Sequence, residues 1–154
     1  MLHPITISHD FAASPAAVWD LVQDFGHIER WWPTDDPAVQ IDRVDIVGEG
    51  FGMIRHIYNK GYPDPVSERL EFLDPDTLTY RLNIVGKAPM GITYYQATGR
   101  IEELPGGGCR LTYRSEFLSS QPGEAEAWLR MAYGLMFRGL ACAVEKSFHC
   151  PIKR

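Results

Sequence analysis

Residues 3–9 alternate between hydrophobic and polar side chains, with Ile5 and Ile7 on one face, and this alternation predicts a first β-strand. Ser14 and the proline after it fit the N-cap and the first position of a helix. We expect two short helices in this part of the chain, the first starting at Ser14 and the second covering residues 27–32.

From residue 39 to residue 119 the hydrophobic period is two, and clusters of Gly, Pro and Asp divide the segment. Six strands are predicted there, at residues 39–48, 51–58, 66–73, 78–85, 92–103 and 109–118. The connections between them are short, whereas a parallel crossover needs about a dozen residues or more. The pattern therefore favours neighbouring antiparallel strands.

Residues 121–148 contain no proline after Pro122, and their hydrophobic residues recur at helical spacing in two adjoining stripes. One stripe comprises Trp128, Met131, Leu135, Gly139 and Cys142, and the other comprises Leu129, Ala132, Met136, Leu140, Ala143 and Val144. A hydrophobic face this wide must be buried. The sequence therefore predicts an α+β domain, with a long C-terminal helix across the concave face of a curved antiparallel sheet of about seven strands. We expect an open volume at one end of this arrangement, where a ligand would bind.

Size and composition narrow the possible functions. The 154 residues contain no repeat or linker, so we expect one domain spanning residues 1–154. A formal net charge of −5 argues against nucleic-acid binding, and no hydrophobic run is long enough for membrane insertion. Three cysteines without the spacing of a disulfide framework, and no secretory signal, predict a reduced, cytoplasmic protein. We expect a monomer or a homodimer.

On three of the predicted strands, the hydrophobic majority marks the inward face. These inward sets include Glu68, Phe72, Tyr80, Tyr113 and Ser115. On two other strands both faces have similar compositions, and the pattern leaves the choice open. The alternatives are Arg55 and Ile57 or His56 and Tyr58 on one strand, and Tyr94 and Gln96 or Tyr95 and Ala97 on the other.

Two interpretations of the inward residues follow. In the first, a cavity has Glu68 and Arg55 as its polar groups, and its wall includes Tyr80, Tyr113, Met131 and Leu135. In the second, the same side chains fill a core and Glu68 reaches solvent at a strand end. An inward carboxylate is costly unless it is paired or hydrated, so Glu68 is the position that most favours a functional role.

Five short segments carry a resemblance to a known family: SPAAVW at 14–19, RWWP at 30–33, GMIR at 52–55, SERLEFLD at 67–74 and LTY at 111–113. In this order and spacing they resemble the START-like superfamily, also called SRPBCC, and in particular its polyketide cyclase/dehydrase branch. The resemblance implies a helix-grip fold, in which a curved antiparallel sheet holds a C-terminal helix around a cavity for a ligand.

The plant abscisic-acid receptors are relatives in this superfamily, and their pocket glutamate stands in a similar Ser/Thr-Glu-Arg-Leu context. That similarity implies that Glu68 faces inward and that residues 59–65 form the loop over the cavity mouth. It also implies an inward position for Arg55, Ile57, Tyr94, Gln96, Met131 and Leu135. The receptors' gate and latch sequences are not reproduced at residues 59–65 and 87–90, so hormone sensing is not implied.

The chain offers little other chemistry. Its five histidines form no HxH or HExxH pattern, so we expect no metal, and its glycine runs match no nucleotide-binding motif, so we expect no cofactor. What remains is acid/base catalysis by one residue. Glu68, with its pKa raised by apolar burial, would transfer a proton while Tyr80 or Tyr94 orients a carbonyl group.

Three functional hypotheses remain. The leading one is a module that binds a small, largely hydrophobic ligand, such as a lipid, polyketide or aromatic compound. The second is a cyclase- or dehydratase-like enzyme that uses Glu68 as general acid or base. The third is a protein-interaction domain of the chaperone-activator type, with Trp31 and Trp32 as an exposed docking patch. We favour Trp32 as a residue that closes the cavity mouth and contacts the ligand, because tryptophan is usually largely buried.

Overall fold

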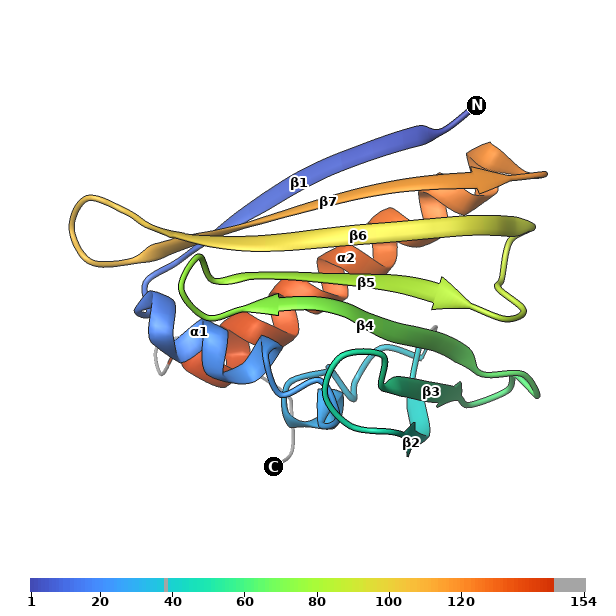
Figure 1. Ribbon diagram of the computed structural model, residues 1–154, viewed down its shortest axis with the longest axis horizontal. Helices are drawn as coiled ribbons and strands as arrows, with labels where there is room; N and C mark the ends of the chain where they lie inside the picture. The colour runs from blue at the N-terminus through green and yellow to red at the C-terminus, as the bar shows by residue number, and fades with distance from the viewer. Residues whose placement is uncertain (38, 146–154) are drawn as a thin grey trace.

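The computed structural model describes residues 1–37 and 39–145. Seven strands form one antiparallel sheet in the order β1-β7-β6-β5-β4-β3-β2 (Figure 1). The strands are β1 (His3–Phe11), β2 (Ile41–Val47), β3 (Ile54–Asn59), β4 (Val66–Asp74), β5 (Thr79–Val85), β6 (Ile92–Glu103) and β7 (Cys109–Ser119). The helices are α1 (Pro15–Val22), the single 3-10 turn η1 (Ile28–Arg30) and α2 (Pro122–Val144). The predicted α+β, helix-grip architecture is confirmed.

The predicted helices are present with shorter bounds. Ser14 caps α1, because its Oγ accepts a hydrogen bond from the backbone N–H of Ala17 at 3.2 Å. The second predicted helix is only the 3-10 turn η1, which is typical of a short connecting segment. Within the described residues α2 ends at Val144, and the backbone of its C-cap residue Glu145 is extended. Residues 146–148 of the predicted helix lie outside the described part of the chain.

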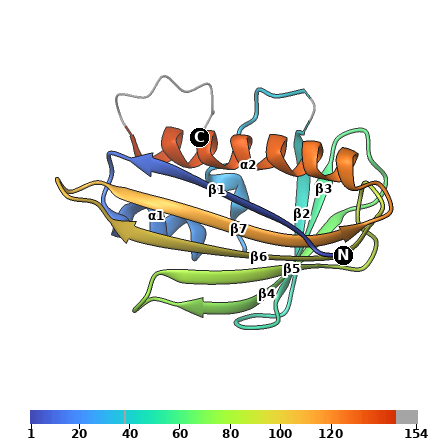
Figure 2. The same cartoon turned by 90° about the horizontal axis from the view of Figure 1, so that it is seen from above.

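The sheet curves around α2. Figure 2 shows α2 lying across one face of the sheet, with β2 and β3 running steeply across the direction of β6 and β7. The hydrophobic core lies between this concave face and the two α-helices. Its largest fully buried side chains include Phe117, Ile5, Leu82, Leu111 and Leu140, which come from β1, β5, β7 and α2. This packing leaves the end of the sheet formed by β2 and β3 as the place where a cavity forms.

A β-bulge in β6 decides which tyrosine of that strand faces α2. The register of β6 against β7 shifts between Ile92 and Tyr94. Because the extra residue turns the following side chains to the opposite face, Tyr95 and Ala97 are buried, whereas Tyr94 is 37% exposed. The expectation that Tyr94 and Gln96 face inward is therefore wrong.

A second bulge has the same effect in β4. The register of β4 against β5 shifts between Leu70 and Phe72, so that Phe72 pairs with Arg81 and Leu73 pairs with Tyr80. Leu73 packs against the hydrophobic core, whereas the ring of Phe72 lies 5.6 Å from the guanidinium carbon of Arg81. The predicted inward position of Phe72 is thus wrong. Glu68 precedes the bulge, and its predicted inward position is confirmed because its side chain lines the cavity under α2.

Candidate functional site

Two adjoining cavities lie at the curved end of the sheet. The inner cavity, of about 90 Å³, is lined by residues of η1, strands β2 to β7 and α2. The outer cavity, of about 160 Å³, lies between the loops at residues 60–65 and 86–91 and the start of α2. Four residues line both cavities: Val39, Asn59, Val66 and Trp128. The loop at 60–65 therefore lies where the family resemblance placed the cavity mouth.

A buried ion pair forms the polar end of the inner cavity. Arg55 of β3 and Glu68 of β4 are directly opposite each other in the sheet register. Nε of Arg55 donates a hydrogen bond to Glu68 Oε1 at 2.7 Å, and Nη2 of Arg55 lies 2.7 Å from the same oxygen. The two side chains are only 8% and 15% exposed. Each charge is therefore compensated by the other in a largely desolvated place.

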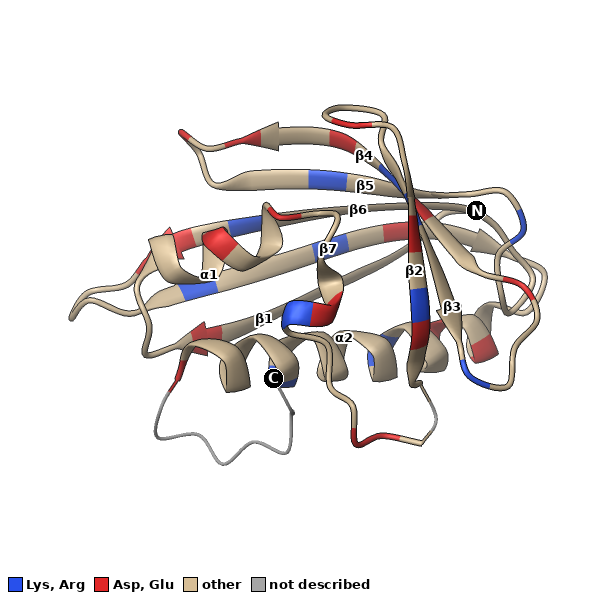
Figure 3. Ribbon diagram, turned by 90° about the horizontal axis from the view of Figure 1, so that it is seen from below, with Lys and Arg blue, Asp and Glu red and all other residues tan. Residues whose placement is uncertain are grey.

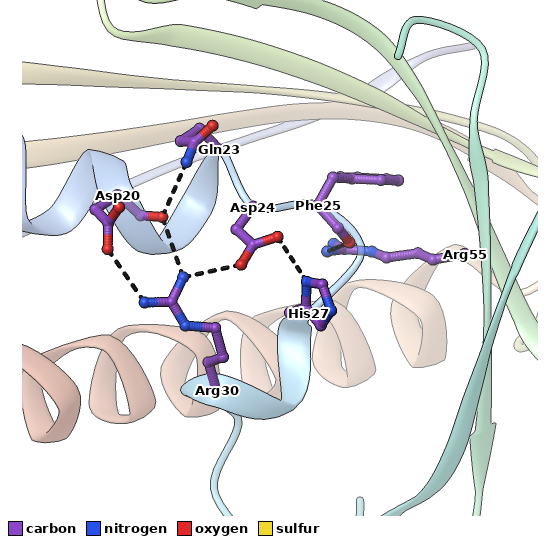
Figure 4. A network of polar contacts seen from close by, with 7 residues as sticks. All are labelled: Asp20, Gln23, Asp24, Phe25, His27, Arg30 and Arg55. Carbon is purple, nitrogen blue, oxygen red and sulfur yellow. Dashed lines mark hydrogen bonds and ion pairs between the residues drawn. The ribbon is translucent and has the colours of Figure 1, made fainter. Parts of the chain in front are cut away.

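Arg55 also connects this ion pair to the segment that follows α1. Its Nη1 donates a hydrogen bond to the backbone carbonyl of Phe25 at 3.2 Å, and its guanidinium carbon lies 4.0 Å from the centre of the Phe25 ring (Figure 4). The sequence pattern predicts apolar surroundings for the Glu68 carboxylate. The structure instead places a guanidinium group against it, so burial is only part of its electrostatic environment.

Three hydroxyl groups form a hydrogen-bonded chain beside the inner cavity. The hydroxyl groups of Tyr95 and Tyr133 are 2.6 Å apart, and Tyr133 donates a hydrogen bond to Ser115 Oγ at 2.7 Å. The ring of Tyr113 meets that of Tyr133 edge-on, with ring centres 5.0 Å apart. Burial raises the pKa of Tyr133 to about 12 and holds the pKa values of Tyr95 and Tyr113 well above their ordinary value. These phenols therefore stay protonated near neutral pH.

Tyr80 is placed by a close contact with the neighbouring strand. It pairs with Gly99 of β6, and a side chain at position 99 would overlap the Tyr80 ring. Burial raises the pKa of the Tyr80 hydroxyl, while the positive charge of Arg55 lowers it and the negative charge of Glu68 raises it. Tyr80 is thus close enough to the ion pair to respond to both charges.

The structure brings most of the sequence-predicted site residues to this region. Those that line the inner cavity are Trp32, Arg55, Ile57, Glu68 and Tyr113. Tyr80 and Ser115 are buried beside it and contact lining residues through the ring of Tyr113 and the hydroxyl of Tyr133.

Met131 and Leu135 of α2 are outside both sets of lining residues. Their predicted position in the cavity wall is wrong, because Trp128 is the only member of their stripe among the lining residues, and α2 otherwise turns its second hydrophobic stripe to the cavity. Four α2 residues in addition to Trp128 line the inner cavity: Leu129, Ala132, Tyr133 and Met136. Tyr133 was missed by the sequence pattern although it continues this stripe, lying four residues after Leu129 and three before Met136.

Trp31 and Trp32 do not form the exposed docking patch of the third hypothesis. Trp31 is 5% exposed and Trp32 is half-buried, and both line the inner cavity. The indole N–H of Trp32 donates a hydrogen bond to the carbonyl of Val39 at 3.4 Å. This pair therefore closes one side of the cavity.

The remaining chemistry of the described residues is sparse. Within residues 1–37 and 39–145, no group of three His, Cys, Asp or Glu side chains could hold a metal ion, and no helix is long and apolar enough to cross a membrane. Cys109 is a free, buried thiol whose pKa is raised to about 11 by burial. Acidic and basic residues are interspersed on the strands seen in Figure 3.

Comparison with known proteins assigns the chain to a class. The family model described as polyketide cyclase / dehydrase and lipid transport matches residues 3–145. Because this match covers nearly the whole chain, the chain belongs to that family, and the resemblance seen in its sequence is confirmed. A search of curated proteins found no match.

Several solved structures share the fold. Norcoclaurine synthase from Thalictrum flavum, in complex with dopamine and hydroxybenzaldehyde, is 16% identical, with 97% of this chain and 90% of that chain covered and a TM-score of 0.75. The protein Ara h 8.0201 is 19% identical, with coverages of 92% and 96% and a TM-score of 0.75. The Zhui aromatase/cyclase from Streptomyces sp. R1128 is 16% identical, with 92% of each chain covered and a TM-score of 0.74. At these identities the similarity shows the fold alone.

Proposed function

We propose that this domain binds a small, largely hydrophobic molecule in the inner cavity. The observation that carries the proposal is a cavity with aromatic walls and one buried polar end, the ion pair of Arg55 and Glu68. Concave, mostly apolar sites with a few convergent polar groups are typical of small-molecule binding. The family description, which includes lipid transport, agrees with this class of ligand.

The size of the inner cavity limits the ligand. Pockets for drug-sized ligands have volumes of roughly 300–1,000 Å³, and an engineered cavity of about 150 Å³ binds benzene. The inner cavity has about 90 Å³ and the adjoining outer cavity about 160 Å³. We therefore expect a single aromatic ring or a short acyl chain to fit this conformation better than a multi-ring polyketide.

Ligand binding can be tested with two matched variants of α2. Trp31, Trp32 and Trp128 line the inner cavity, so tryptophan fluorescence reports its occupancy during a titration with toluene or phenol. Ala132→Phe should fill the cavity and abolish binding, because Ala132 lines it. Ala127→Phe changes an exposed position of the same helix and should leave binding unchanged. No binding by the wild-type protein, or equal binding by both variants, would contradict the proposal.

A second candidate function is proton transfer by Glu68. The observation that favours it is a carboxylate in the cavity wall beside tyrosine hydroxyls that stay protonated near neutral pH. The probe 5-nitrobenzisoxazole tests this idea, because removal of its ring C–H proton by a base breaks the N–O bond and releases a coloured phenolate. Glu68→Gln should remove this reaction while ligand affinity is kept. An equal rate in the variant would contradict the role of Glu68 as a base.

A further inference from the structure

Asn59, the last residue of β3, has a polar group that the fold leaves without a partner. Its side-chain oxygen Oδ1 is buried, and within the described residues it has no hydrogen bond. Buried polar groups in folded proteins are nearly always hydrogen-bonded, and an unpaired one destabilises the protein that holds it. The position of Asn59 therefore calls for a group that the protein alone does not supply.

Asn59 lies where the inner and outer cavities meet. It lines both of them, together with Val39, Val66 and Trp128. Among these four side chains, which form the neck between the cavities, only Asn59 carries a hydrogen-bond acceptor, because the indole N–H of Trp128 is a donor alone. The amide carries an acceptor oxygen and a donor nitrogen, and its terminal torsion is broad, so either atom can turn toward a molecule in the neck.

The charges near the neck indicate an uncharged ligand. In the inner cavity the charge of Arg55 is matched by Glu68, and at the outer cavity Lys87 Nζ lies 2.8 Å from Asp64 Oδ2. Neither cavity thus offers an unmatched charge among its described lining residues. Burying an ion without a partner is far more costly than burying a hydroxyl group that forms a hydrogen bond.

We propose that Asn59 is a specificity-determining residue that selects uncharged, hydroxyl-bearing ligands over hydrocarbons of similar size. This inference rests on the proposed function, because it names the chemical class of molecule that the cavity accepts. The hydroxyl group of such a ligand would lie at the neck, where it can donate a hydrogen bond to the Asn59 oxygen or accept one from the amide nitrogen. The hydrophobic part would lie against the aromatic walls of the inner cavity.

Phenol and toluene provide a matched pair of probes, since they differ chiefly by a hydroxyl in place of a methyl group. Asn59→Leu has a similar volume and removes the amide. It should lower the ratio of phenol affinity to toluene affinity by about tenfold, the loss expected for one buried hydrogen bond. Using this ratio cancels the different intrinsic hydrophobicities of the two probes.

Asn83 supplies the control. Its Oδ1 is also buried without a partner within the described residues, but Asn83 lines neither cavity. Asn83→Leu makes the same chemical change and should leave the affinity ratio unchanged. Both variants should fold with an unchanged or raised Tm, because each replaces a buried amide oxygen that has no hydrogen bond with an apolar side chain of similar shape.

The outcomes separate this inference from the function on which it rests. If both probes bind the wild type and the affinity ratio is the same in Asn59→Leu, the role of Asn59 is overturned while ligand binding stands. If Asn59→Leu weakens the binding of both probes equally, Asn59 only shapes the cavity, and its proposed role in selectivity is also overturned. If neither probe binds the wild type, the proposed function fails and the inference fails with it. Benzoate tests whether the ligand must be uncharged, and it should bind at least about tenfold more weakly than phenol. Equal affinities for benzoate and phenol would contradict the preference for uncharged ligands.

Discussion

The ion pair between Arg55 and Glu68 gives the sharpest prediction for stability. Removing one partner of a buried pair leaves an uncompensated charge and costs about 3–5 kcal/mol, whereas replacing both by apolar residues is often nearly neutral. We therefore expect Arg55→Met and Glu68→Leu each to lower the free energy of unfolding by about 3–4 kcal/mol. Arg55→Met also removes the hydrogen bond to the Phe25 carbonyl, which adds about 1 kcal/mol to its effect.

The double variant should be far more stable than the two single effects imply. It leaves neither charge buried and loses chiefly the contacts of Arg55 with Phe25, so we expect a cost of about 2–3 kcal/mol and a coupling free energy of about 3 kcal/mol or more. Urea unfolding followed by tryptophan fluorescence measures all four proteins. Additive effects would refute the reasoning, since they would mean that the two charges are stabilised independently.

An exposed pair of the same type is the control. Arg110 of β7 and Asp10 of β1 are also opposite each other in register, with Nε to Oδ1 at 2.6 Å and Nη2 to Oδ2 at 3.1 Å. These side chains are 46% and 53% exposed, so water screens both charges. The corresponding cycle of Arg110→Met and Asp10→Leu should show little coupling. Comparable coupling in both cycles would show that desolvation is not what distinguishes the cavity pair.

Three further predictions concern the surroundings of the site. Gly99→Ala should lower the free energy of unfolding by about 1–3 kcal/mol in urea, because the added methyl group would overlap the Tyr80 ring; an unchanged value would contradict the contact. Tyr133→Phe should lower it by about 1–3 kcal/mol, because the Tyr95 hydroxyl loses its buried partner, and full stability would exclude that hydrogen bond. The hydrogen bond between His27 and Asp24 raises the His27 pKa above 6.5, so the stability that it contributes is complete below that pH and is lost as the pH rises through the folded-state pKa. An NMR titration of His27 should show the raised pKa in the wild type and a lower one in Asp24→Asn. Identical His27 titration midpoints in the two proteins would contradict this prediction.

Hydrophobic periodicity was sufficient to predict the order and type of the elements, because each strand buries one face and α2 buries a wide one. It did not predict the side-chain direction beyond a bulge. On β6 both faces carry tyrosine, and the shift in register near Ile92 reverses the face that Tyr94 and Tyr95 would otherwise occupy. A bulge depends on how two strands pair, and that pairing leaves no trace in the periodicity of one strand.

The rotation of α2 about its axis was a second property that the sequence did not determine. Two adjoining stripes are hydrophobic, and both are largely buried, since Leu135 is 6% exposed and Leu140 is fully buried. Only the position of the cavity distinguishes them, and it depends on how the sheet curves at β2 and β3. The sequence therefore predicted that α2 covers the site. It placed Met131 and Leu135 in the cavity wall, whereas Ala132 and Met136 line the cavity in the structure.

The pairing of Arg55 with Glu68 shows why a polar site is harder to predict than the core around it. An inward glutamate can be identified from one strand, but its partner is on the neighbouring strand, at a position where composition left both faces open. The register between β3 and β4 brings the two residues together, and the guanidinium group also contacts the carbonyl and the ring of Phe25. Phe25 precedes the turn that carries Trp31 and Trp32, so one arginine joins the polar end of the cavity to the segment that forms its aromatic wall. A change in the charge of Glu68 therefore also affects the arginine that contacts this segment of the cavity wall. For this reason Glu68→Gln must be compared with the wild type in ligand affinity and in unfolding free energy before a loss of activity is assigned to the loss of a catalytic base.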